Sequence, residues 1–185
     1  DTPPLRKLKV PIRTFGVAVD EERQELFLST QAPPRVAVYR KMASGEDKLL
    51  RLLKGDRTRL ADAHGIALDV KNKWLFVANW GSQSFSNNGE GPGGRFDPPS
   101  ITVYPLDADG DMPPVRVIQG PKTQLNWPAK MSFDQDTGEL YVANSVGQSI
   151  LVFRGTDQGD VAPTRVLKGG KTGLSYPLGL TIDAK

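Results

Sequence analysis

The chain of 185 residues contains no cysteine. Disulfide bonds, thiolate catalysis and zinc or iron–sulfur sites with cysteine ligands are therefore excluded. It also contains only one histidine, His64. A zinc site with three histidines cannot be built from these residues, and a Ser-His-Asp triad would have to use this single ring. A structural or solvent-facing histidine is the favoured interpretation, with a catalytic or ligand role as the alternative.

Long hydrophobic runs and a strong charge of one sign are also missing. No segment approaches the roughly 18 apolar residues that a transmembrane helix needs, and no signal peptide is recognisable at the start. We expect no transmembrane segment, and the missing cysteines do not fix the compartment. The net charge is +3, and the basic residues are spread among acidic ones rather than gathered in a stripe. No nucleic-acid partner is expected.

Glycine and proline are plentiful, with 19 and 15 residues, which favours a turn-rich all-β architecture. The chain also matches itself along its length. Four apolar segments, FGVAVD, HGIALD, AKMSFD and LGLTID, end at Asp20, Asp69, Asp134 and Asp183, which lie 49, 65 and 49 residues apart. A period near 49 with one enlarged unit indicates an internal repeat.

Each repeat contains four short apolar segments that are rich in β-branched and aromatic residues and are separated by turn residues. Four strands per repeat are typical of β-propeller blades. The sequence predicts a single propeller segment over 1–185, with full blades at 15–54, 65–119 and 130–168 and partial strands at 5–9 and 179–183. Closed rings need about four to eight blades. We therefore expect an arc, completed by further blades of a longer chain or by further copies.

The motifs P-x-G-x-x-x-D, LYVAN, ITVY or ILVF, and G-D-x-x-P-x-R-V-x-x-G resemble the repeats of bacterial NHL-type and lactonase-like propellers. The resemblance runs from about residue 5 to residue 183. It implies a six-bladed ring and a periplasmic or extracellular location. It does not fix an activity, because related propellers include lactonases, lyases and interaction platforms.

In a propeller, the connection from the last strand of one blade to the first strand of the next shares a face with the connection between the second and third strands. The first set contributes His64, Trp127 and Tyr176 from near-equivalent positions. The extra residues of the second blade lie at 80–100, in the connection between its second and third strands. This connection supplies Trp80, Phe85, Arg95 and Phe96. Aromatic and arginine side chains dominate binding hot spots. The sequence predicts a partner-binding face here, with simple packing of the long loop or a lid over a small pocket as alternatives.

Two polar patterns raise the question of a metal. Asp107, Asp109 and Asp111 resemble the opening of a calcium loop, but the later glutamate is missing and similar acidic turns recur at 44–47 and 157–160. Asn79 and Asn144 recur at one blade position. The resemblance to calcium-dependent lactonases makes a channel metal conceivable, whereas recurrence favours a structural role in each blade. No cofactor is expected, with calcium as the weaker alternative.

The sequence presents no catalytic set. The first hypothesis is a non-catalytic interaction or scaffold module within a larger extracytoplasmic assembly, binding a protein through the 80–100 face. The second is a lactonase-like hydrolase or lyase whose channel metal is completed by missing blades. The third is binding of carbohydrate or cell envelope through Trp80, Trp127 and Tyr176.

Overall fold

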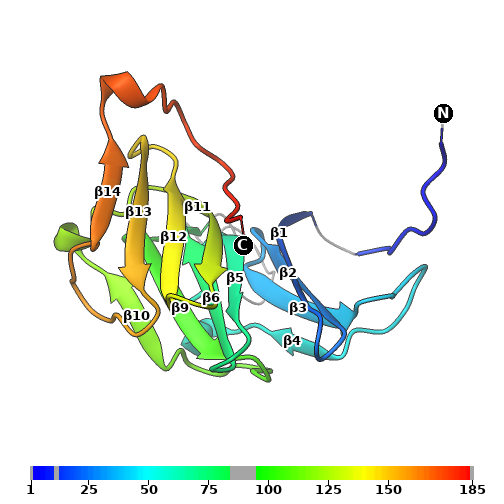
Figure 1. Cartoon of the computed structure of the whole chain (residues 1–185). Helices are drawn as coiled ribbons and strands as arrows, with labels where there is room; N and C mark the ends of the chain where they lie inside the picture. Colours follow the sequence, from blue (N-terminus) through cyan, green and yellow to red (C-terminus); the bar gives the residue numbers. More distant parts are fainter. Residues whose placement is uncertain (1, 11–12, 84–94, 184–185) are drawn as a thin grey trace.

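The computed structural model describes residues 2–10, 13–83 and 95–183 and consists of three four-stranded antiparallel sheets in chain order (Figure 1). The first sheet holds β1 (Thr14–Asp20), β2 (Glu25–Thr30), β3 (Arg35–Arg40) and β4 (Arg51–Leu53). The second holds β5 (Ala63–Asp69), β6 (Trp74–Asn79), β9 (Ser100–Pro105) and β10 (Arg116–Gln119). The third holds β11 (Pro128–Asp134), β12 (Glu139–Asn144), β13 (Ser149–Arg154) and β14 (Arg165–Lys168). The predicted all-β, bladed fold is confirmed.

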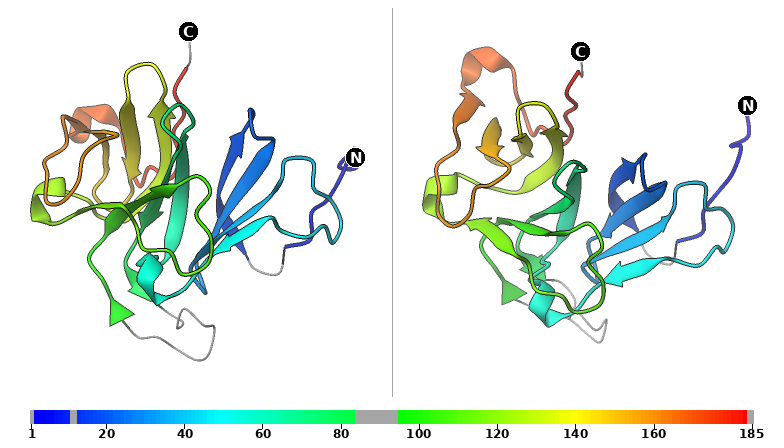
Figure 2. Two further views of the ribbon diagram at one scale, coloured as in Figure 1. Left: turned by 90° about the horizontal axis from the view of Figure 1, so that it is seen from below. Right: turned by 60° about the horizontal axis from the view of Figure 1, so that its bottom comes forward.

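The three sheets fan out from a common centre, with β1, β5 and β11 innermost and β4, β10 and β14 outermost (Figures 1 and 2). The enlarged second blade carries a small extra hairpin, β7 (Ser82–Gln83) with β8 (Arg95–Phe96), between β6 and β9. Residues 179–183 form no strand. Among the described residues, no helix is long and apolar enough to span a membrane.

The aspartate that closes each repeat segment builds the turn to the second strand. Oδ1 of Asp20 accepts hydrogen bonds from the backbone N–H groups of Glu22 and Arg23, and Oδ1 of Asp134 accepts them from residues 136 and 137. These backbone donors hold the pKa of Asp134 below its ordinary value, because they stabilise the ionised carboxylate. The repeated aspartate is therefore a turn residue.

The hydrophobic core lies between neighbouring blades. Strands of the first and second blades enclose one cluster around Phe27, Leu53 and Tyr104, and the second and third enclose another around Phe76, Ile118 and Phe153. The innermost strands approach most closely. A Cβ atom on Gly65 would lie 2.0 Å from the backbone oxygen of Ala129, so only glycine allows this approach of β5 to β11.

A second contact joins the outer parts of the blades. The loop before the last strand of each blade pairs in parallel with the last strand of the preceding blade, through Leu53↔Gly110 and Ile118↔Gly159. Leu8 pairs with Gly45 in the same way, so the segment 5–9 lies where a preceding blade would place its last strand. We call this contact the blade latch. It covers strand edges that would otherwise expose unpaired backbone groups.

Both ends of the fan expose apolar side chains. At β14 the side chains of Val166 and Leu167 are exposed, and at the other end so are Val17 and Val19 of β1. After β14 the chain returns toward the centre, where the backbone N–H of Lys130 donates to the carbonyl of Leu178 (Figure 1).

Candidate functional site

Three connections between blades have one repeated geometry. Each contains a short 3₁₀ turn: η1 (Asp56–Thr58), η2 (Pro121–Thr123) and η3 (Gly170–Thr172). The threonine that ends each turn donates its hydroxyl to the carbonyl three residues earlier and accepts the N–H two residues later. These side-chain bonds to the backbone fix the loops without any sheet pairing.

Four residues after each threonine, one residue adopts a left-handed backbone conformation. These residues are Asp62, Trp127 and Tyr176, with φ of 57°, 54° and 46°, and we call them the rim positions. Bulky side chains rarely adopt positive φ, and such residues gather at binding and active sites. Asp62 is buried, whereas 46% of Trp127 and 59% of Tyr176 is exposed. His64, which the sequence placed near Trp127 and Tyr176 in the repeat, lies two residues beyond the rim position of its own connection.

Both sets of connections share one face, which we call the loop face. The backbone N–H of Trp80, which follows β6, donates to the carbonyl of Asp62. The N–H of Ser145, which follows β12, donates to the carbonyl of Trp127 in the same way. Asp62 and Trp127 are thus tied to the connections that leave the second strands of their blades.

Four rings on the loop face form a continuous column, which we call the aromatic stack. His64 lies against Trp80 with ring centroids 3.6 Å apart and nearly parallel planes, and Trp80 lies 4.4 Å from Trp127. Phe15 packs at an angle on His64, at 4.5 Å. The indole N–H of Trp80 donates to the carbonyl of Pro128 across the blade boundary, at 3.0 Å. The structure thus brings together three of the candidate residues.

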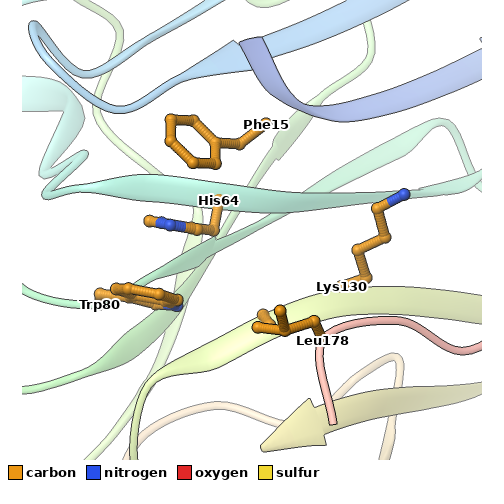
Figure 3. A pocket seen from close by; sticks show the side chains of 6 residues that line it. Phe15, His64, Trp80, Lys130 and Leu178 are labelled. Atoms are coloured by element: carbon orange, nitrogen blue, oxygen red, sulfur yellow. The ribbon is translucent and has the colours of Figure 1, made fainter. Parts of the chain in front are cut away.

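Beside the stack is a hollow of about 240 Å³, lined by Phe15, His64, Trp80, Ala129, Lys130 and Leu178 (Figure 3). Phe15, His64, Ala129 and Leu178 occupy the same position in four successive repeats. The hollow, which we call the central hollow, therefore lies at the axis of the fan. Its walls are almost entirely carbon, and Lys130 is the lining residue that carries a charged side chain.

The side chain of His64 is packed between other rings and is not exposed to solvent. Its side chain is buried between Phe15 and Trp80, and Nδ1 lies 3.1 Å from both the carbonyl and Oδ1 of Asp62. A ring held on both faces has no freedom to approach a substrate. The geometry agrees with the structural interpretation of this histidine.

Other candidates lie outside the stack. Phe96 is 82% exposed on β8, and no ring contact among the described residues joins Phe96 or Tyr176 to the aromatic stack. Arg95 is placed by its backbone on β8. Phe85 lies outside the described residues.

The asparagines do not line an open metal site. Oδ1 of Asn79 accepts the N–H of Ala61, and Oδ1 of Asn144 accepts the N–H of Asn126, one residue before each rim position. Their amide groups donate to nearby oxygens, including Thr102. Both side chains therefore hold the loops that present the rim positions.

The acidic turn of the second blade also serves structure. Oδ1 of Asp109 accepts the N–H of Leu52, and Oδ1 of Asp111 accepts the N–H of Arg57 at the start of η1. These two carboxylates, with Asp107 nearby in sequence, face the preceding blade as part of the blade latch. No cluster of three or more acidic or histidine side chains that could hold a metal ion occurs within 2–10, 13–83 and 95–183.

Arginines in the last strands of the first two blades also form hydrogen bonds to the next blade. Arg51 donates two hydrogen bonds to Glu25 and one to the carbonyl of Leu106 in the next blade, and Arg116 donates to the equivalent carbonyl of Gly155. The hydrogen bonds from Arg51 hold the pKa of Glu25 below its ordinary value, because they stabilise the ionised carboxylate.

The sequence interpretation did not single out Phe15, Asp62 or Lys130. The signal for Lys130 was present in the repeat: Gly16, Gly65 and Gly179 stand where the third unit has lysine. Asp62 could have been found by aligning the connections on their threonines.

Comparisons with known proteins agree with the fold. No family model matches the chain, and no curated protein matches it. Solved structures do match, among them the WD40 repeats of RRP9 (12% identity, TM-score 0.57), U3-55K (12%, 0.58) and the WD40 β-propeller domain of Doa1 (15%, 0.53). They cover 87%, 87% and 84% of this chain, which spans 40%, 41% and 44% of theirs. At these identities the likeness shows a β-propeller fold and supports no specific NHL or lactonase-like type.

Proposed function

We propose that this chain is a non-catalytic interaction scaffold that binds a protein partner on the loop face. The observation that carries the proposal is the exposure of Trp127 and Tyr176 at rim positions, on loops fixed by threonine and asparagine side chains. Rigid, partly exposed aromatic side chains are frequent anchors of protein interfaces, because they bury large areas at little entropic cost.

The polar groups of the face support a binding role over catalysis. His64 is held between two rings, and the amides of Asn79 and Asn144 are used by backbone groups. A lactonase-like activity would need groups beyond these, so no observation favours it. Carbohydrate binding by Trp80 is also not favoured, because two near-parallel rings at 3.6 and 4.4 Å must occupy its opposite faces.

We further propose that additional blades complete the ring. Asp111 and Asp160 accept the N–H groups of Arg57 and Lys122 at the first two 3₁₀ turns. At η3, a Cβ atom on Gly169 would meet nothing within 4 Å, and β14 is exposed. The η3 turn and β14 therefore have the geometry of the first two blade latches, and we expect the next blade to supply the partner residues. A place in a larger extracytoplasmic assembly is likewise a proposal, which rests on the family resemblance alone.

The binding proposal is tested by selecting peptides from a displayed random library against the folded chain. Affinities of the selected peptides are then compared for Trp127→Ala, Tyr176→Ala and Met42→Ala. Met42 is the matched control, because its side chain is as exposed as that of Tyr176, at 59%, and lies outside the loop face. We expect a loss of about tenfold or more for the rim variants and no loss for the control. Equal affinity for all three, or no selectable peptide, would refute the proposal.

A further inference from the structure

The central hollow contains a lysine where the repeat otherwise has glycine. Gly16 and Gly65 cannot be replaced without a clash, since a Cβ atom would lie 2.3 Å from the oxygen of His64 and 2.0 Å from that of Ala129. At the next boundary the third repeat carries Lys130, whose backbone N–H donates to the carbonyl of Leu178 at 3.3 Å. Its side chain lies beside Gly179, where a Cβ atom would be 3.9 Å from Cδ of Lys130. The third repeat therefore has a long, charged side chain at the position where the first two repeats allow only glycine.

The ammonium group of Lys130 is not used by the fold. Lys130 is exposed, and its ammonium group makes no ion pair or hydrogen bond with any residue in the part of the chain that the structure describes. By contrast, two lysines at the opposite face are paired, Lys71 with Asp136 and Lys41 with Glu21. An unpaired cation on an otherwise apolar wall suits a ligand that combines an apolar body with a negative charge.

The volume of the central hollow limits the size of the group that it can bind. Its volume of about 240 Å³ is below the roughly 300–1,000 Å³ of pockets that enclose whole small molecules. It accommodates a single side chain or chain end of a larger partner. The ring faces of His64 and Trp80 are already stacked, which disfavours nucleobases, because a base needs a free aromatic face.

We propose that the central hollow receives an apolar group bearing a carboxylate, supplied by a partner polypeptide, and that Lys130 neutralises this carboxylate. Phe15, Ala129 and Leu178 contact the apolar part (Figure 3). The inference rests on the proposed function, since it names the chemistry that the loop face recognises. A chain-terminal carboxylate and a glutamate side chain are two sources of the same chemistry.

Three probes separate these sources: N-acetyl-phenylalanine, its amide, and N-acetyl-glutamic acid α-amide. Binding is followed by the indole N–H resonances of Trp80 and Trp127, with Trp74 as an internal reference because it packs under Arg116, away from the hollow. We expect at least one carboxylate probe to bind about tenfold more tightly than the neutral amide, as charge-assisted hydrogen bonds allow. Phenylalanine preference would assign a chain terminus, and glutamate preference a side chain.

The deciding variants are Lys130→Gln and Lys122→Gln. Lys122 is an exposed lysine on η2 of the same face that does not line the hollow. The carboxylate preference should vanish in Lys130→Gln and persist in Lys122→Gln and Lys130→Arg. Equal binding of acid and amide, or equal losses in both glutamine variants, would overturn the inference. Peptides that depend on Trp127 but not on Lys130 would leave the proposed function standing and refute this inference alone.

Discussion

Replacing Gly65 by alanine tests the packing that places the central hollow. The added Cβ atom would lie 2.0 Å from the backbone oxygen of Ala129, and an ordinary contact needs about 3.4 Å, so β5 and β11 must separate by about 1.4 Å. No rotamer change relieves the clash, because the obstructing atom belongs to the backbone. Overpacking of this kind costs about 1–3 kcal/mol, reduced by about 0.4–1 kcal/mol because alanine restricts the unfolded chain. We expect a net loss of about 1–2 kcal/mol.

The matched control is Gly170→Ala, where the new Cβ atom would meet nothing within 4 Å. That variant should be neutral or slightly more stable than the parent chain. Urea unfolding followed by tryptophan fluorescence gives both free energies, and thermal unfolding should show a midpoint about 2–8 °C lower for Gly65→Ala. Near-ultraviolet circular dichroism should also weaken, because His64 adjoins the substituted residue and lies in the aromatic stack. Equal stability of the two variants would refute the close approach of the inner strands.

Further predictions concern the latch, the ion pair and the stack. Asp111→Ala should lower unfolding free energy by about 1 kcal/mol and speed hydrogen exchange at the Arg57 amide, because that N–H loses its acceptor; unchanged exchange would contradict the latch. Since Arg51 lowers the pKa of Glu25, its stabilisation is present above the unfolded pKa of about 4.3 and disappears as pH falls through the lower folded value. Glu25→Gln should therefore be less stable at pH 7 and lose less stability on acidification; parallel pH profiles would refute this. Trp80→Ala should cost about 1–3 kcal/mol by removing two ring contacts, measured by urea unfolding; an unaltered midpoint would argue against the stack.

The internal repeat made the fold predictable from the sequence. Strand segments in each unit alternate β-branched and aromatic residues between turn residues, and the aspartates at 20, 69 and 134 are turn acceptors in the structure. Turn chemistry and strand patterning are local, so one sequence carries them. Three sheets follow from counting the units.

The candidate site was harder to predict from the sequence, because it depends on contacts between different blades. Trp80 and Trp127 are 47 positions apart and meet only because the second and third blades pack side by side. The sequence called His64 and Trp127 near-equivalent, and the threonine-anchored turns show that the residue in the same position as Trp127 is Asp62. The carboxylates of Asp109 and Asp111 resembled calcium ligands because their hydrogen-bond donors, the N–H groups of Leu52 and Arg57 in another blade, cannot be recognised from one loop.

Residues that recur among the repeats and residues that differ between repeats contribute differently to the proposed partner binding on the loop face. Positions such as the turn threonines, Gly16 and Gly65 fix the backbone geometry, and Gly16 and Gly65 leave no room for a larger side chain. Positions that vary between repeats, such as Trp127, Tyr176 and Lys130, have exposed side chains. A rigid scaffold with a few variable, preorganised side chains binds without a large ordering cost. Specificity on this face should therefore follow the identity of the variable side chains, and exchanging Trp127 or Lys130 should alter partner preference without unfolding the blades.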